Sequence, residues 1–141
     1  MPDRRALTDM LGRTQLFQGL SRKELETVAM TSREVDHAAG QDVVHEDAEA
    51  VGFHLIISGS ATVIQGGRKL RTLGPGDTFG EIALIDGGRR SASVHADTAL
   101  HTLSIMTWHF TPLLLEHPTI AHKLLLELCR RLREAEARPP I

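Results

Sequence analysis

The stretch FGEIALIDGGRRSASV, residues 79–94, decides the fold of this chain and carries most of its chemical information. It indicates a turn that leads into about one turn of helix, ended by Gly87-Gly88, after which Arg90 opens a strand. Unpaired amides at a helix start, together with the positive end of the helix dipole, favour an anion. Arg90 adds a permanently charged planar fork that matches two phosphate oxygens. The stretch therefore predicts a phosphate-binding turn.

Glu81 adds a second chemical requirement to this turn. It lies nine residues before Arg90, and its carboxylate would repel a phosphate but can accept hydrogen bonds from a sugar hydroxyl. A ligand with one phosphate beside one hydroxyl satisfies both side chains. The alternative is a structural salt bridge between Glu81 and Arg90, which is a seldom stabilising arrangement for buried charges.

Around this stretch, residues 35–105 consist of short β-branched runs separated by Gly, Asp and Pro, which is typical of a compact antiparallel β unit. Gly66-Gly67 supplies the positive φ angles of a tight hairpin turn. Residues 74–77 form a second turn signal, and residues 91–96 and 99–105 are predicted as two further strands.

Helices are expected on both sides of the β unit, over residues 7–34 and 107–137. Ser21 and Glu24 form a capping box that starts one of them, and Pro118 suits the first turn of a long final helix. An apolar stripe with a four-three-four-three spacing follows: Ala121, Leu125, Leu128, Leu132 and Ala135. Such a stripe is typical of a packing or dimer helix.

Composition limits the classes of function. The chain has 141 residues, which suits a single domain over 1–141, and 16 Lys plus Arg against 18 Asp plus Glu, which argues against a surface built to grip nucleic acid or anionic lipid. Cys129 is the only cysteine, so an intrachain disulfide is excluded, a reducing compartment is expected, and the thiol is expected to serve as a small apolar side chain. No apolar run approaches the roughly 20 residues of a membrane span, so we expect a cytoplasmic protein.

Residues 79–94 resemble the phosphate-binding cassette of the cyclic-nucleotide-binding domain family, which is found in catabolite-activator-type regulators, protein kinase regulatory subunits and cyclic-nucleotide-gated channels. The resemblance extends over most of the chain, since residues 16–21 resemble the family's N-terminal helical motif, residues 52–59 its central strand and residues 73–81 the run into the cassette. It implies an α+β, mainly β fold: an antiparallel β-barrel or jelly roll flanked by N-terminal helices and a long C-terminal helix.

The resemblance also implies a role for each cassette residue. Glu81 would accept a bond from the ribose 2′-hydroxyl with help from the Gly80 carbonyl, and Arg90 would pair with the cyclic phosphate. The amides of Ala83 and Ser91 would complete the phosphate cradle. The full set of expected binding residues is Gly80, Glu81, Ile82, Ala83, Arg90, Ser91 and Ala92. The expected ligand is cAMP, with cGMP as the alternative, and the sequence names no residue that covers the base.

Three positions depart from residues that are common in the family. Asp47 stands where many members have glycine, Arg89 replaces a common proline, and Ser93 replaces a common threonine. None of them removes a ligand contact that the resemblance implies, so they bear on loop geometry.

The function expected from these features is that of a regulatory sensor, not an enzyme. Ligand would draw the β unit and the final helix together and change what that helix presents to a second copy or an effector protein. Because six residues follow Ala135, we expect no DNA-binding module and no direct DNA binding. Arg130, Arg131 and Arg133 alternate with glutamates and are interpreted as a solvated helix face.

Two other classes of function compete with the sensor. An interaction module with a vestigial pocket is disfavoured because Glu81 and Arg90 occur together. A cupin-like metal enzyme is disfavoured because the eight histidines include no His-x-His pair, so no metal is expected.

Overall fold

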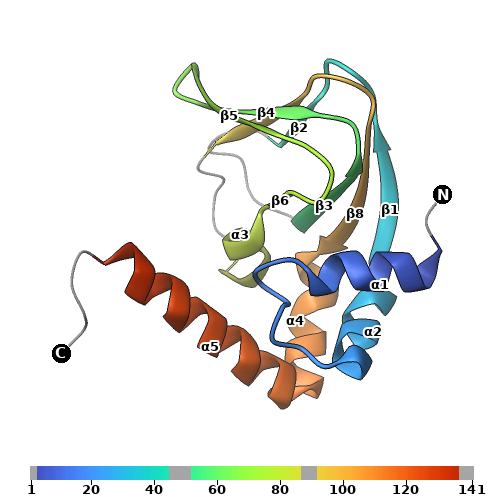
Figure 1. The fold of residues 1–141 in the computed structure, drawn as a ribbon, viewed down its shortest axis with the longest axis vertical. Helices are drawn as coiled ribbons and strands as arrows, with labels where there is room; N and C mark the ends of the chain where they lie inside the picture. Colours follow the sequence, from blue (N-terminus) through green and yellow to red (C-terminus); the bar gives the residue numbers. More distant parts are fainter. Residues whose placement is uncertain (1–2, 45–51, 87–91, 137–141) are drawn as a thin grey trace.

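The computed structural model describes residues 3–44, 52–86 and 92–136. Its helices are α1 (Arg4–Gly12), α2 (Arg22–Met30), α3 (Glu81–Asp86), α4 (Thr107–Glu116) and α5 (Pro118–Ala135). Its strands are β1 (Ser32–His37), β2 (Asp42–Val44), β3 (Gly52–Ser58), β4 (Ala61–Gln65), β5 (Arg68–Leu73), β6 (Thr78–Phe79), β7 (Ser93–Ala96) and β8 (Leu100–Met106). Figure 1 shows the strands at one end of the molecule and the helices at the other.

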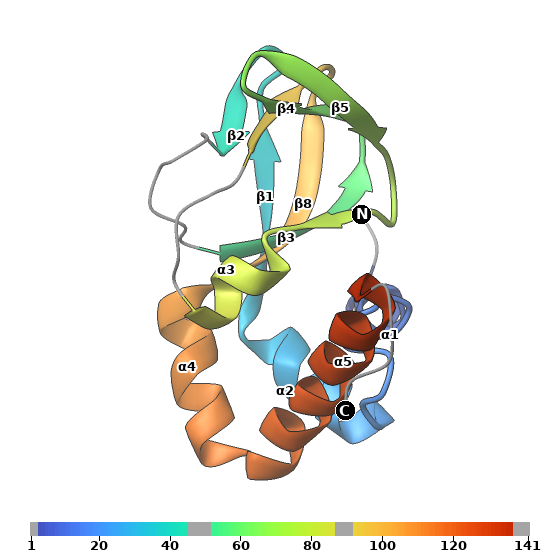
Figure 2. The same cartoon turned by 90° about the vertical axis from the view of Figure 1, so that its left-hand side faces the viewer.

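The strands form two antiparallel sheets of four strands each. One sheet has the order β1-β8-β3-β6 and the other β2-β7-β4-β5. This arrangement confirms the expected mainly β fold in its jelly-roll form, since the described strands fall into two sheets and no closed barrel is seen. In Figure 2 the helices lie below the sheets, and α3 lies between the two regions.

The hairpin expected at the diglycine is present. Strands β4 and β5 pair in register from Gln65 opposite Arg68, and Gly66 and Gly67 have φ angles of +57° and +78°. Two successive positive φ values are what a two-residue type I′ turn requires, which explains why glycine occupies both positions.

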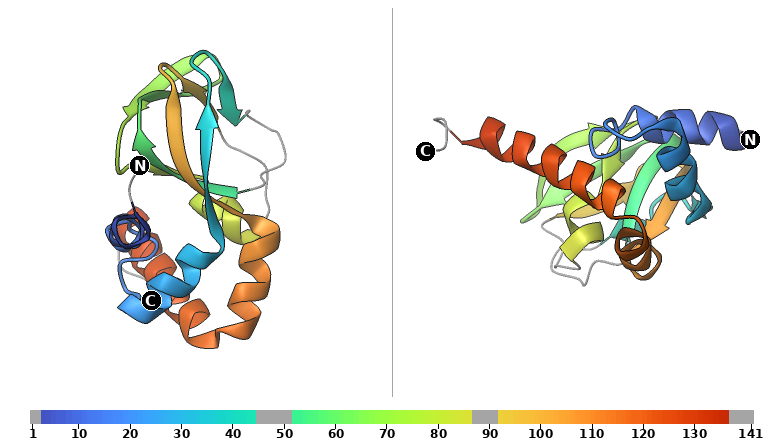
Figure 3. Two further views of the ribbon diagram at one scale, coloured as in Figure 1. Left: turned by 90° about the vertical axis from the view of Figure 1, so that its right-hand side faces the viewer. Right: turned by 90° about the horizontal axis from the view of Figure 1, so that it is seen from below.

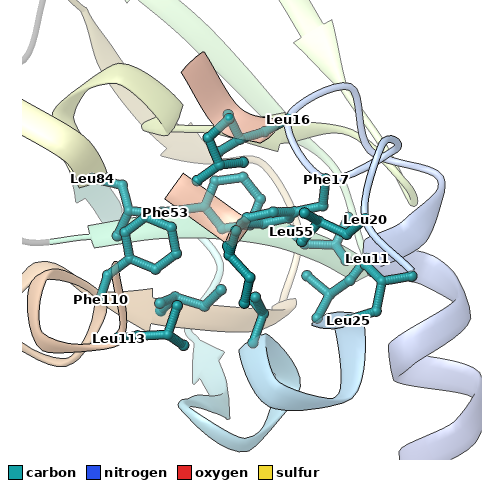
Figure 4. Packing of buried hydrophobic residues seen from close by; sticks show 14 of the residues in the cluster. Leu11, Leu16, Phe17, Leu20, Leu25, Phe53, Leu55, Leu84, Phe110 and Leu113 are labelled. Carbon is teal, nitrogen blue, oxygen red and sulfur yellow. The ribbon is translucent and has the colours of Figure 1, made fainter. Parts of the chain in front are cut away.

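The main core lies between the helices and the outer face of the β1-β8-β3-β6 sheet (Figure 4). Phe17, Phe53 and Phe110 are completely buried at its centre. The ring of Phe17 makes edge contacts with Phe53 and Phe110, at centroid distances of 5.6 and 6.1 Å. These contacts fix the turn after α1 against both the sheet and α4.

Helix α2 begins and ends where side chains satisfy its terminal groups. The predicted capping box is confirmed, with Ser21 and Glu24 exchanging backbone hydrogen bonds. At the other end the hydroxyls of Thr31 and Ser32 donate to carbonyls of the last turn. The chain therefore enters β1 at Ser32, three residues before the predicted start of the β unit.

Helix α5 does not bury the apolar stripe that was predicted to pack, but a different face. Its buried residues are Ile120 and Leu124, whereas Leu125 and Leu132 of the predicted stripe are each 60% exposed. Cys129 is exposed as well, so the expectation of a packed thiol was wrong. Figure 3 shows the C-terminal half of α5 projecting beyond the body of the molecule. Among the described helices, none has both the length and the apolar character needed to cross a bilayer.

A histidine clamped between two carboxylates joins β1 and β8. His101 on β8 contacts Glu34 through Nε2 at 2.7 Å and Asp36 through Nδ1 at 2.6 Å. These two bonds, with Glu34 contributing most, raise the pKa of His101. Burial lowers the pKa of the neighbouring His37.

The stability of the fold should depend on pH through His101. Because its pKa rises on folding, its stabilisation is complete below about pH 6.5 and is lost as the pH rises through the raised value. His101→Gln should therefore lower the melting temperature clearly at about pH 6 and little at about pH 9. The lowered pKa of His37 makes stability change with pH in the opposite direction. Because His37 is present in both wild type and His101→Gln, the difference between their melting temperatures largely removes its contribution. A difference that widens with rising pH would contradict the assignment, and Glu34→Gln should reproduce the predicted pattern.

Candidate functional site

The chain reaches the candidate site through a turn that is fastened to the central strand. The amide of Gly74 donates to the Asp77 carboxylate at 2.8 Å. Backbone hydrogen bonds join Ile56 of β3 to Gly76 and to Asp77, at 2.8 and 2.9 Å. Gly80 then has a φ of +89°, a conformation that favours glycine, and it turns the chain from β6 into α3. The predicted turn at residues 74–77 is confirmed, and it fixes where α3 begins.

The buried side chain of Leu84 anchors α3 to the core, and the partly buried Ile85 packs against the same core. Leu84 is completely buried in the same cluster as Phe53 and Phe110, as Figure 4 shows. Its amide donates to the Gly80 carbonyl at 2.9 Å and closes the first helical turn. Glu81 lies three residues earlier, on the same side of the helix as Leu84 but at its first residue, and 23% of its side chain stays exposed.

Two side chains from different parts of the chain hold the Glu81 carboxylate. The hydroxyl of Thr78 donates to Oε1 at 2.5 Å, and Nη1 of Arg131, on α5, lies 3.5 Å from Oε2. A carboxylate has about four lone-pair positions, so the contacts with these described residues leave Glu81 able to accept a further hydrogen bond. Within the described part of the chain, Glu81 is thus a partly buried acceptor where α3 meets α5.

Arg131 is a residue of the candidate site that was not predicted from the sequence, because the run of arginines and glutamates on the final helix was interpreted as a solvated face. Its side chain is 22% exposed, and its Nε lies 3.6 Å from Glu127 on the preceding turn. Glu127 is only 10% exposed and is also paired with Arg130. Arg130 contributes most to a lowered pKa of Glu127. One face of the charge run is therefore turned toward α3.

The structure describes some of the predicted binding residues and not others. Gly80 and Glu81 lie together at the start of α3, and Ala92 lies just before β7 with intermediate exposure. The backbones of Ile82 and Ala83 lie in α3, while their side chains are not described. Two predicted ligand residues and two of the departures from the family pattern lie outside the described residues: Arg90, Ser91, Asp47 and Arg89.

The part of the chain that the structure describes holds no group of three or more His, Cys, Asp or Glu side chains arranged to bind a metal ion. Two of its histidines contact hydroxyls inside the β unit. His37 lies 3.1 Å from the Thr102 hydroxyl, and His54 lies 2.7 Å from that of Ser104 and stacks on Phe79. These contacts give both rings a role in packing within the β1-β8-β3-β6 sheet, and His54 also packs against β6.

Comparisons with known proteins show which family the chain belongs to. Residues 34–117 match the sequence profile of the family described as "Cyclic nucleotide-binding domain". The "Cyclic AMP receptor protein" of Thermus thermophilus is 32% identical over 126 residues, which are 86% of this chain and 58% of that protein.

Solved structures show the same fold. The N-terminal domain of a transcriptional regulator from Streptomyces coelicolor superposes with a TM-score of 0.82 at 27% identity, covering 89% of this chain and 92% of the other. The regulatory domain of Toxoplasma gondii PKA, crystallised with cAMP, superposes with a TM-score of 0.72 at 26% identity, covering 79% and 46%.

The fold and the site define a regulatory ligand-binding domain in which a short helix, anchored in the core, meets a long C-terminal helix. The chain belongs to the cyclic nucleotide-binding domain family, since the family profile covers more than half of its residues. The resemblance inferred from residues 79–94 is thereby confirmed. The chain spans less than two thirds of the length of the Thermus thermophilus protein.

Proposed function

We propose that this chain binds cAMP and that Glu81 reads the ribose 2′-hydroxyl. The observation that carries the proposal is the state of the Glu81 carboxylate, which is positioned by Thr78 and Arg131 and still has lone pairs to offer. A ribose hydroxyl that donates to Glu81 at this point would also lie near the guanidinium of Arg131. Arg131 thus supports the ionised carboxylate and supplies donors for the hydroxyl oxygen.

Arg90 carries the phosphate end of the same ligand in this proposal. A guanidinium offers two parallel donors to two phosphate oxygens, and the amides of Ala83 and Ser91 add neutral donors beside it. Ile82 and Ala92 provide apolar lining. This division places the anion and the sugar hydroxyl on separate groups, so that the Glu81 carboxylate does not face the phosphate.

Ser91 alone does not decide between cAMP and cGMP. A hydroxyl directly after the phosphate arginine can reach either the phosphate or, with the base in the syn form, the guanine amino group. We assign it to the phosphate, because the similar Thermus thermophilus protein is named for cyclic AMP. One hydrogen bond is worth about 0.5 to 1.5 kcal/mol, so the preference for cAMP should be about twofold to tenfold.

Signalling is proposed to pass through α5. The Glu81 contact with Arg131 joins the ligand site to this helix, whose exposed leucines offer a surface to a second copy or an effector protein. Ligand that strengthens the contact would shift the population toward the state in which α5 lies against α3. We place the protein in the cytoplasm, because a lone exposed thiol suits a reducing compartment.

The ribose role of Glu81 is tested with 2′-deoxy-cAMP. In wild type the loss of the hydroxyl should weaken binding by about 1 to 3 kcal/mol, because a hydrogen bond to a charged acceptor is lost. In Glu81→Ala the parent nucleotide and the 2′-deoxy analogue should bind almost equally. Glu81→Gln should weaken cAMP less than Glu81→Ala does, because its amide oxygen still accepts.

Calorimetric titration of each protein with both nucleotides gives these values. Glu116→Ala, at an exposed glutamate of α4, is the matched control and should keep the wild-type ratio. If replacing cAMP by 2′-deoxy-cAMP lowers the affinity of Glu81→Ala as much as it lowers the affinity of wild type, Glu81 does not bind the ribose hydroxyl.

We further propose that α5 forms a homodimer through its exposed leucines. Leu125, Leu126 and Leu132 are 57 to 60% exposed, so α5 carries apolar side chains outside the face that meets the core. Light scattering of wild type should give twice the mass of the chain. Leu132→Asp should give a monomer, whereas Leu115→Asp, at an exposed leucine of α4, should not. A protein that is monomeric before any substitution would refute the dimer.

A further inference from the structure

Beyond its first turns, α5 is attached to the rest of the molecule by polar contacts more than by apolar ones. Its buried apolar side chains, Ile120 and Leu124, both lie in the N-terminal half. The same side continues with Glu127 three residues after Leu124, the partly exposed Leu128 four residues after it, and Arg131 four residues after Glu127. The face that begins as core therefore continues as an ionic surface directed at α3.

Glu127 is the centre of this surface. Its carboxylate accepts from the side-chain amide of Gln18 at 3.2 and 3.3 Å, and it is paired with Arg130 at 2.5 Å. Its other cationic neighbour is Arg131, whose Nε lies 3.6 Å away and is buried without a hydrogen-bond partner among the described residues. A nearly buried carboxylate beside that Nε holds the guanidinium in one orientation by charge.

Gln18 gives Glu127 a fixed point of attachment. It follows Phe17, which is completely buried against Phe53 and Phe110, so the turn between α1 and α2 cannot shift without disturbing the core. A continuous set of contacts thus runs from this turn to the ligand site: Gln18 to Glu127, Glu127 to Arg131 and Arg131 to Glu81.

We propose that Glu127 is a positioning residue for the nucleotide site: it holds the Arg131 guanidinium over Glu81 and, through Gln18, ties α5 to the turn between α1 and α2. This rests on the proposed function, in which Glu81 and Arg131 together bind the ribose. Glu127 does not touch the ligand. Its effect on affinity passes through Arg131.

The test is a titration with cAMP and 2′-deoxy-cAMP. Glu127→Gln keeps the size of the side chain and removes its charge, and it should weaken cAMP by about twofold to tenfold while reducing the discrimination against the deoxy analogue. Glu134→Gln is the matched control, because Glu134 also pairs with Arg130 but is exposed and lies about two turns after Glu127. It should behave as wild type in both respects.

A double substitution separates positioning from a general loss of stability. In an Arg131→Gln background, Glu127→Gln should have no further effect on cAMP affinity, since the guanidinium that it positions is gone. An equal loss in both backgrounds, or wild-type affinity and discrimination in Glu127→Gln, would overturn the proposal.

A measurement without nucleotide keeps this proposal separate from the proposed function. The Nε proton of Arg131, identified by its absence in Arg131→Lys, should exchange slowly with solvent because the atom is buried. Glu127→Gln should make its exchange fast, whereas Glu134→Gln should leave it slow. If wild type binds no cyclic nucleotide, the proposed function is wrong, but the exchange rate of the Arg131 Nε proton still shows whether Glu127 holds Arg131. Fast exchange of this proton in wild type would refute the positioning role.

Discussion

Arg90→Ala should weaken cAMP binding by about 2 to 4 kcal/mol, which corresponds to about 30-fold to 1,000-fold in affinity. The loss is large because charge-assisted bonds to a phosphate are stronger than neutral ones, and a phosphate that is removed from water would be left without its cation. Calorimetric or fluorescence titration of the nucleotide-free protein measures it.

Arg89→Ala provides the matched control for this experiment. It removes the same charge one position earlier in the sequence, so it tests whether general electrostatic attraction accounts for binding. We expect it to change affinity by less than about 1 kcal/mol at moderate ionic strength. Wild-type affinity in Arg90→Ala, or equal losses in the two variants, would remove Arg90 from the site.

Phe17→Ala should destabilise the protein by about 3 to 5 kcal/mol, because it leaves a cavity at the centre of the main core. The ring is completely buried and makes edge contacts with both Phe53 and Phe110, so its removal loosens the turn after α1 as well as the sheet and α4. Urea denaturation followed by circular dichroism gives the free energy of unfolding.

Phe17→Leu should cost much less than Phe17→Ala, since most of the volume is kept. Met30→Ala, at a methionine that is 75% exposed, should change the free energy of unfolding by less than about 0.5 kcal/mol. A loss below about 1 kcal/mol for Phe17→Ala would mean that the ring is not central to the core.

Local signals in the sequence were reliable wherever a backbone requirement selects a residue type. Gly66 and Gly67 predicted their hairpin because few other residues adopt two successive positive φ angles. Ser21 and Glu24 predicted the start of α2 because each satisfies a backbone amide that the helix leaves unpaired. In these cases the determining contacts lie within a few residues, so the sequence contains all of them.

The orientation of α5 was harder to predict because both sides of the helix carry leucines. The apolar stripe through Leu125 and Leu132 is real, but it is exposed, and the core is met by Ile120 and Leu124. Which side packs inward depends on the angle at which α5 leaves α4, and a periodic pattern does not contain that angle.

For the same reason, the orientation of Arg131 toward Glu81 was not predicted from the sequence. Charge runs on helices usually face solvent, and in this run the exposed Glu134 follows that expectation. Arg131 does not face solvent, because it lies on the same side of α5 as the buried Leu124. Glu127 is three residues after Leu124, and Arg131 is four residues after Glu127. That spacing was the available signal, and its use required knowing which face of α5 meets the core.

If the chain binds a cyclic nucleotide with its own residues, titration of nucleotide-free wild type with cAMP and cGMP should show saturable binding of one nucleotide per chain. We expect cAMP to be preferred by about twofold to tenfold and 2′-deoxy-cAMP to bind more weakly than cAMP. Absence of saturable binding of either nucleotide by correctly folded protein would contradict the proposed function.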